Sequence, residues 1–408
     1  MRRTIGCFWG CALLLLFAAL PLQAADLAVK GGVVYTVSGE PIKDGVVLIE
    51  NGKIKKVGPA SRVRIPSGVP VHEAAAVTPG LVDVHTVMGF AGIYNSDRGQ
   101  VQDQDQLEKS SPVQPELRAV DAYDPIEPLV EFARSLGVTT IHTGHGTGAV
   151  ISGQTLIAKT RGGTVEDVVL REQASVAATL GPSVSHNFDS PGTRAKVVSM
   201  LRESLVAADT YRARMKGDKQ PDRNLAHETM AKVLDGDLPL MITAQSAGEI
   251  ASALRLQKEF GFKLWLDGAA ESYRMVDEIR DAGIGVMLHP TMIRSGGDME
   301  NAGFDTAVKL AQAGIPFAIQ SGFESYVPKT RIILYEAQAA VHVGLAPEQA
   351  LRAITLTPAE MLGIADRVGS IEAGKDADLV LFDGDPLEYT THACKVLIEG
   401  ELVSEECR

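Results

Sequence analysis

Short apolar runs alternate with amphipathic segments of helical length through the middle of the chain. The apolar runs predict buried strands at 81–84, 138–141, 238–242, 263–266, 284–288 and 315–319. Between two of them, Ser246 and Glu249 form the capping box that begins a helix, and Gly261 stands where that helix should end. Segments 155–159 and 165–170 are candidates for two further strands. This alternation predicts a (β/α)8 barrel, with a doubly wound sheet as the alternative.

The two ends of the chain have a different pattern, in which apolar and polar residues alternate. We expect strands at 27–36, 45–50, 53–57, 377–383 and 395–404. Asn51–Gly52 favours a tight hairpin turn because both residues tolerate positive φ, and a second hairpin is expected at Gly400–Glu401. We therefore expect residues 25–78 and 370–408 to form a small β-sandwich beside a barrel that spans residues 79–369.

The first 24 residues resemble a secretory signal peptide. Arg2 and Arg3 precede an apolar stretch at 7–20, and small residues follow it. We expect cleavage after Ala24 and a periplasmic or secreted protein; an uncleaved anchor is the alternative. No later stretch is apolar enough to cross a membrane, so no membrane contact is expected after cleavage. The intact mass of the exported protein would test the cleavage site.

Composition and charge narrow the classes of partner. The 408 residues are 45% hydrophobic and 22% charged, which is typical of a globular protein, and the formal net charge is −12. Because no basic cluster stands out, nucleic acid is not an expected partner.

Cysteine positions predict one disulfide. Cys7 and Cys11 leave with the signal peptide, whereas Cys394 and Cys407 remain. The hairpin expected at Gly400–Glu401 places Cys394 opposite Cys407 at a non-hydrogen-bonded pair, where Cα atoms lie about 4.5 Å apart. An exported chain can keep such a pair oxidised.

Two motifs resemble the amidohydrolase superfamily, in particular its imidazolonepropionase-like and prolidase-like members. Residues 78–85 read Thr-Pro-Gly-Leu-Val-Asp-Val-His, and residues 369–380 read Gly-Ser-Ile-Glu-Ala-Gly-Lys-Asp-Ala-Asp-Leu-Val. The resemblance extends over nearly the whole mature chain. It implies hydrolysis of an amide-type C–N bond in a small molecule, assisted by a divalent ion such as zinc in the barrel mouth.

Most metal ligands that the resemblance implies are replaced. The family pattern places His-x-His on the first barrel strand, histidines on the fifth and sixth, and an aspartate on the eighth. Here His85 remains as a weak ligand, whereas Val87, Thr243, Gly268 and Gly322 occupy the other positions. We therefore assign no catalytic residue and no cofactor. The candidate pocket consists of His85, Thr243, Gln245, Asp267 and His289.

Two alternatives remain open at this point. A relocated zinc site could use His142, His145 and His289, which follow the second and seventh barrel strands. Lys159 could correspond to the carbamylated lysine of two-metal relatives, but an ordinary salt-bridging lysine is favoured.

Two hypotheses for function follow. The first is an exported hydrolase that acts on non-peptide or dipeptide C–N bonds with a degenerate metal centre. The second is a non-catalytic pseudoenzyme that binds a ligand or serves as a partner subunit, in a homo-oligomer or with a related intact amidohydrolase.

Overall fold

The computed structural model describes residues 26–90, 105–322, 324 and 328–408. The expected signal peptide at 1–24 lies outside these residues, as does the middle of the long loop after the first barrel strand. Within the described part of the chain, no helix is both long and apolar enough to cross a membrane.

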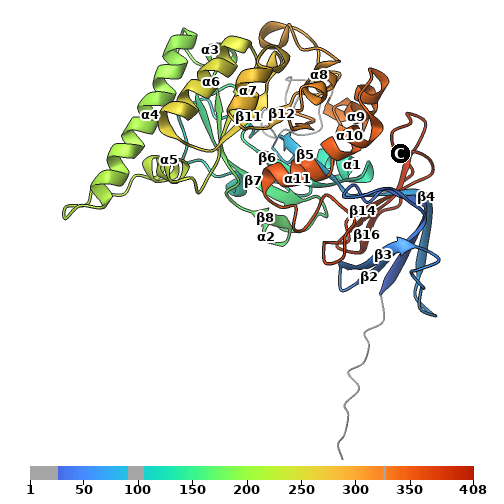
Figure 1. Cartoon of the computed structure of the whole chain (residues 1–408). Helices are drawn as coiled ribbons and strands as arrows, with labels where there is room; N and C mark the ends of the chain where they lie inside the picture. The colour runs from blue at the N-terminus through green and yellow to red at the C-terminus, as the bar shows by residue number, and fades with distance from the viewer. Residues whose placement is uncertain (1–25, 91–104, 323, 325–327) are drawn as a thin grey trace, which may run out of the picture.

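Eight strands follow one another in chain order around a nearly closed barrel (Figure 1). They are β5 (Leu81–Thr86), β6 (Val138–Gly144), β7 (Ile151–Lys159), β9 (Val176–Thr179), β10 (Leu240–Ala244), β11 (Leu264–Gly268), β12 (Val286–Leu288) and β13 (Phe317–Ile319). A short ninth strand, β8 (Val169–Arg171), pairs with β7 outside this path. A parallel bridge between Thr86 and Gly322 joins the first strand to the end of the last. Chain-order pairing supports the barrel and contradicts the doubly wound alternative.

One barrel strand runs in the opposite direction to the others. β7 pairs antiparallel with both β6 and β9, whereas the other barrel pairs are parallel. The connection 145–150 is too short for a crossover helix, so β6 and β7 form a hairpin. The candidate strand at 155–159 thus lies in β7. The candidate strand at 165–170 is wrong, because these residues form α2 (Val165–Val168) and only the start of β8. The barrel strand that follows β7 is β9 instead.

Helices cover the outside of the barrel (Figure 1). Besides α2, they are α1 (Pro128–Ser135), α3 (Ser183–Asn187), α4 (Arg194–Met215), α5 (Leu225–Asp235), α6 (Ala247–Phe260), α7 (Val276–Asp281), α8 (Thr306–Gln312), α9 (Ile333–His342), α10 (Pro347–Ala353) and α11 (Leu356–Leu362). The predicted capping box begins α6: the Ser246 side chain accepts from the Glu249 N–H. Gly261 ends that helix in the left-handed conformation, as expected.

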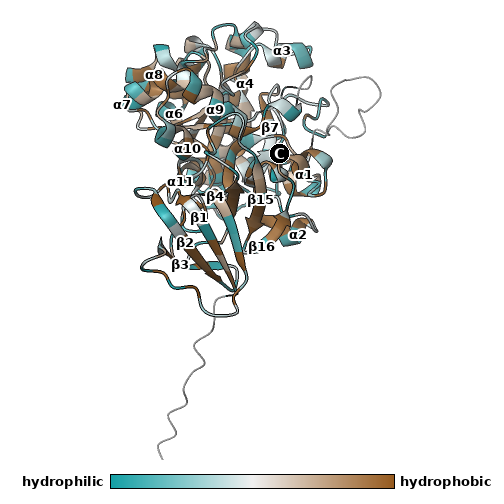
Figure 2. Ribbon diagram, turned by 90° about the vertical axis from the view of Figure 1, so that its right-hand side faces the viewer, coloured by the Kyte–Doolittle hydropathy of each residue, from teal (hydrophilic) through white to brown (hydrophobic). Residues whose placement is uncertain are grey.

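Both ends of the chain contribute to one seven-stranded sheet. Its strands are β1 (Leu27–Val34), β2 (Ile42–Glu50), β3 (Lys53–Pro59), β4 (Val71–Pro79), β14 (Leu379–Phe382), β15 (Ala393–Ile398) and β16 (Glu401–Ser404). The strand order is β16-β15-β14-β4-β1-β2-β3, so the C-terminal strands continue the N-terminal sheet edge to edge (Figure 2). The expected two-sheet sandwich is therefore not confirmed, because β14 pairs with β4 instead of stacking on it.

The last hairpin holds the predicted disulfide. Its turn consists of Glu399 and Gly400, both with positive φ, which is one residue earlier than expected. A register shift between Val396 and Leu397 makes up part of that difference, and farther along Ala393 and Arg408 exchange backbone hydrogen bonds in the expected register. Cys394 and Cys407 are consequently bonded, and the predicted pairing is confirmed.

A buried ionic cluster joins the barrel to the seven-stranded sheet. Lys159, at the end of β7, is 1% exposed and forms ion pairs with Asp378 and, at 3.1 Å, with Asp376. Asp376 also binds Lys53 and Arg367. Lys159 is therefore a salt-bridging lysine, but it is buried at the boundary between the barrel and the sheet and does not line the mouth pocket.

Candidate functional site

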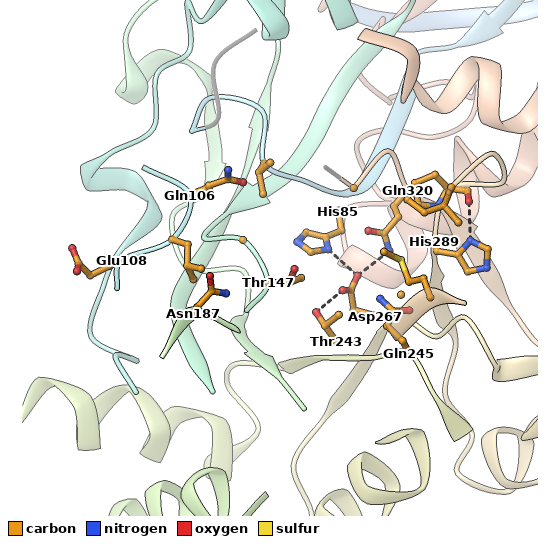
Figure 3. Close-up of a pocket in the computed structure, with 18 of the residues that line it drawn as sticks. His85, Gln106, Glu108, Thr147, Asn187, Thr243, Gln245, Asp267, His289 and Gln320 are labelled. Carbon is orange, nitrogen blue, oxygen red and sulfur yellow. Dashed lines mark hydrogen bonds and ion pairs between the residues drawn. The ribbon is translucent and has the colours of Figure 1, made fainter. Parts of the chain in front are cut away.

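The five residues of the candidate pocket line one cavity at the barrel mouth. The cavity has a volume of about 820 Å³, and Figure 3 shows their side chains on its wall. They come from the carboxyl ends of β5, β10 and β11 and from the residues that follow β10 and β12. Because parallel barrel strands all open toward the same face, residues distant in the sequence meet there. The residues are His85, Thr243, Gln245, Asp267 and His289.

Asp267 is the centre of a buried hydrogen-bond network. Its Oδ1 accepts from His85 Nδ1–H at 2.8 Å and from Gln320 Nε2 at 2.9 Å, while its Oδ2 accepts from the Thr243 hydroxyl at 2.6 Å. Burial alone would raise the pKa of Asp267, but His85, Thr243 and Gln320 together hold it below its ordinary value. Asp267 therefore remains an anion whose two oxygens are both engaged.

His85 is oriented by that anion. Burial alone would lower the pKa of His85, but the charge and hydrogen bond of Asp267 outweigh burial, with help from Asp83, and raise it. Its Nε2 is buried and has no hydrogen-bond partner. In Figure 3 this nitrogen points away from Asp267 toward the side of the pocket where Thr147 lies. An unpartnered imidazole nitrogen can exchange a proton with a group that comes within hydrogen-bond distance of it.

A second buried carboxylate, Asp83, lies on β5, the strand that carries His85. Asp83 Oδ1 accepts from the backbone N–H of Ser321 at 3.1 Å and of His85 at 3.3 Å. Burial raises the pKa of Asp83 to about 7. Its contacts connect β5 to the residues after β13, so Asp83 helps close the barrel next to the site.

Several pocket residues were not predicted from the sequence. Gln320 follows β13, while Gln106, Thr147 and Asn187 belong to the opposite wall (Figure 3). A polar residue directly after a barrel strand is a usable signal for Gln320, but the others lie on loops and a short helix that leave no periodic pattern. Residues 106–109, between β5 and α1, also line the cavity.

The relocated histidine site is not assembled. His142 Nδ1 donates to the Val84 carbonyl at 2.7 Å and its Nε2 bonds to the Thr155 hydroxyl at 2.7 Å, inside the barrel. Burial lowers the pKa of His142 to about 3. Neither His142 nor His145 lines the mouth pocket, whereas His289 does. This alternative is therefore wrong, because both ring nitrogens of His142 are already hydrogen-bonded, one to a residue of β5 and the other to a residue of β7.

The residues at the strand ends do not fit a divalent metal. Both oxygens of Asp267 already accept hydrogen bonds. At Gly268 a Cβ atom would lie 2.3 Å from Nε2 of Gln245, so the glutamine fills the space that a ligand side chain at 268 would need. Across residues 26–90, 105–322, 324 and 328–408, no three His, Cys, Asp or Glu side chains are grouped to hold an ion.

Comparisons with known proteins agree with this architecture. The model of the amidohydrolase family matches residues 302–403. The chain is 25% identical over 395 residues to amidohydrolase tasK of Hapsidospora irregularis, with 87% of this chain aligned, but it spans only 39% of that protein. It is 24% identical over 396 residues to imidazolonepropionase of Shewanella baltica, covering 89% of this chain and 93% of the relative.

A solved structure extends the similarity to three dimensions. The crystal structure of an amidohydrolase from Thermotoga maritima superimposes with a TM-score of 0.86 at 26% identity. The superposition covers 93% of this chain and 100% of the other. The similarity in sequence and in structure thus extends over nearly the whole described chain, through both the barrel and the seven-stranded sheet. The protein belongs to the amidohydrolase superfamily.

Proposed function

We propose that this chain is an exported hydrolase that cleaves an amide-type C–N bond of a small molecule without a resident metal ion. The observation that carries the proposal is the His85–Asp267 pair, in which Nδ1 is bound at 2.8 Å and Nε2 has no partner. The similarity to imidazolonepropionase supports the bond type, and the signal-like segment at 1–24 supports export to the periplasm or beyond.

His85 supplies the proton transfers in this mechanism. Its neutral Nε2 accepts a proton from water while the water oxygen forms a bond to the amide carbon. The same nitrogen then returns the proton to the amide nitrogen as the C–N bond breaks, which leaves a carboxylic acid and an amine. Asp267 is a positioning residue: it keeps the proton on Nδ1 and stabilises the transient imidazolium.

The metal chemistry of the superfamily enters no step here. A divalent ion would polarise the carbonyl and acidify the attacking water. Since the residues of this site do not fit such an ion, we expect slow hydrolysis that is insensitive to chelators.

The pH profile tests the proton-transfer role of His85. Because His85 must be neutral to act as a base and its pKa is raised, kcat/KM should increase as the pH rises through a midpoint above 6.5. In Asp267→Asn the raising charge is lost and burial dominates, so the midpoint should move to lower pH while the plateau falls. The assay uses N-acyl amino acids, dipeptides and lactams after dialysis against EDTA. An unchanged midpoint in the variant would contradict the assignment.

A second candidate is the non-catalytic binding or partner subunit. It is favoured by Gly322, which stands where the resemblance implies a catalytic aspartate, and by the engagement of both Asp267 oxygens. In that case small molecules bind without turnover, and light scattering of the protein mixed with a related amidohydrolase detects a joint complex.

A further inference from the structure

One edge of the seven-stranded sheet carries a cluster of basic side chains. Residues 53–64 include five lysines and arginines and no acidic residue, in a chain whose formal net charge is −12. The expectation that no basic cluster stands out therefore does not hold at this edge. The five residues belong to β3, the edge strand, and to the loop that follows it, and all are exposed. The basic edge consists of Lys53, Lys55, Lys56, Arg62 and Arg64.

The loop after β3 is held against the sheet, so a fixed backbone presents its cations. The N–H groups of Arg62 and Val63 donate to the Pro59 carbonyl at 2.8 and 3.0 Å. Val63 is buried and packs against apolar residues of β1 and β2, while its neighbours Arg62 and Arg64 are exposed. Lys56 Nζ donates to the Arg62 carbonyl at 3.4 Å and so joins the strand to the loop.

Three of the five cations lack an anionic partner. Lys53 and Lys55 form ion pairs with carboxylates of the same sheet and of the segment before β14. In the part of the chain that the structure describes, no carboxylate forms an ion pair with Lys56, Arg62 or Arg64. Exposed charges are largely screened beyond the Debye length, which is about 8 Å at physiological salt. Acidic groups farther away than that therefore do not cancel the attraction of these cations for a nearby anion.

The basic edge adjoins the point where the N-terminal segment enters the described structure. Asp26, the first described residue, donates its N–H to the Ile49 carbonyl at 2.8 Å, and its Oδ2 accepts from the Asn51 N–H at 2.6 Å. Asn51 lies in the turn between β2 and β3, two residues before Lys53. The residues before Asp26 include the apolar stretch 7–20, which is expected to direct export. Chain connectivity therefore places the basic edge next to the membrane that receives this stretch during export.

We propose that the basic edge docks the protein onto the surface of a bilayer that contains anionic phospholipids. The three unpaired cations bind the headgroup phosphates, and the two paired lysines contribute less. Each basic residue near an anionic surface strengthens binding about fivefold, and salt weakens the attraction. The expectation of no membrane contact after cleavage came from the absence of an apolar span, and surface charge is a separate determinant of membrane binding.

Docking at this edge leaves the pocket accessible. β4 ends at Pro79 and β5 begins at Leu81, so the sheet adjoins the amino-terminal end of the first barrel strand. The pocket lies at the carboxyl ends of the barrel strands, where His85 ends the same strand. Figure 2 shows β2 and β3 at the end of the molecule opposite α3. The proposal is therefore independent of the chemistry proposed for the pocket.

Co-sedimentation of the mature chain with vesicles tests the proposal. One set of vesicles contains phosphatidylglycerol and phosphatidylcholine in equal parts, and the other contains phosphatidylcholine alone. We expect binding to the anionic vesicles at about 0.1 M salt, loss of that binding at about 1 M salt, and no binding to the neutral vesicles. Equal binding to both kinds of vesicle, or no binding to the anionic kind, would overturn the proposal.

A variant that lacks the three unpaired cations provides the second arm. Lys56→Gln, Arg62→Gln and Arg64→Gln together should weaken binding to the anionic vesicles about 100-fold. The matched control removes three positive charges from exposed positions in and after α6, on the barrel wall away from β2 and β3 (Figure 1). It should bind as the parent does, and it combines Arg255→Gln, Lys258→Gln and Lys263→Gln. Equal binding of the two triple variants would contradict the assignment.

Other occupants of the basic edge would give different results. Self-association at low salt that the first triple variant abolishes, without vesicle binding, would assign the edge to a second copy of this acidic chain. Salt-dependent binding of a duplex oligonucleotide, again without vesicle binding, would assign it to nucleic acid. Either result would overturn the membrane proposal.

Discussion

Replacing His85 with alanine is expected to lower kcat on an accepted amide by about 10²- to 10⁴-fold, because the variant removes the group that moves the proton. KM should change much less, since the other residues that line the pocket are retained. Steady-state kinetics in the presence of EDTA measures both constants.

His342→Ala is the matched control for this experiment. His342 is an exposed histidine in the last turn of α9 and does not line the pocket, so its loss should leave kcat unchanged. Circular dichroism verifies that His85→Ala remains folded. Full activity in folded His85→Ala would show that another group performs the proton transfer.

Replacing Lys159 with methionine is expected to destabilise the protein by about 3–5 kcal/mol. The substitution leaves the buried Asp378 without its cation, and Asp378 is only 4% exposed. Denaturant unfolding measures the loss. Adding Asp378→Asn to Lys159→Met should recover part of it, because the uncompensated charge is then removed.

Lys30 provides the comparison for that prediction. It pairs with Glu73 at 3.4 Å on the surface of the seven-stranded sheet, with both side chains largely in solvent. Lys30→Met should therefore cost at most about 1 kcal/mol. Similar losses in the two variants would show that the cluster around Lys159 does not couple the sheet to the barrel.

The barrel was predictable from the sequence because its signals are local. Apolar runs and caps such as Ser246 and Gly261 mark strands and helices within a few residues. The direction of β7 was not predictable in the same way, since it depends on how six connecting residues turn between two strands of ordinary composition. The pairing of β14 with β4 brings together parts of the chain about 300 residues apart, which no local pattern encodes.

The candidate site was predictable in its position but not in its connections. His85, Thr243 and Asp267 follow from the rule that barrel strands end at the mouth. Their joining through hydrogen bonds requires side-chain geometry that the sequence does not contain. The clearest example is Gln245 over Gly268: the sequence shows a ligand loss at Gly268, whereas the structure shows that the Gln245 side chain fills the space that a ligand there would need.

The contact between Gln245 and Gly268 indicates that other side chains have replaced the lost metal ligands in this site. A site that had only lost its ligands would leave polar groups unpaired. Instead, the Asp267 oxygens, both Gln320 N–H groups and the Gln245 oxygen all have partners. His85 Nε2, which the proposed chemistry uses, has no partner, and neither has His289 Nε2 on the same pocket wall.

Elemental analysis of the gently purified protein tests the absence of a metal centre most directly, with His85→Ala measured beside the parent. The account predicts well under one zinc, manganese or iron per chain in both proteins, since the single histidine that remains from the implied ligand set is bound to Asp267. Stoichiometric metal in the parent that disappears in His85→Ala would contradict it.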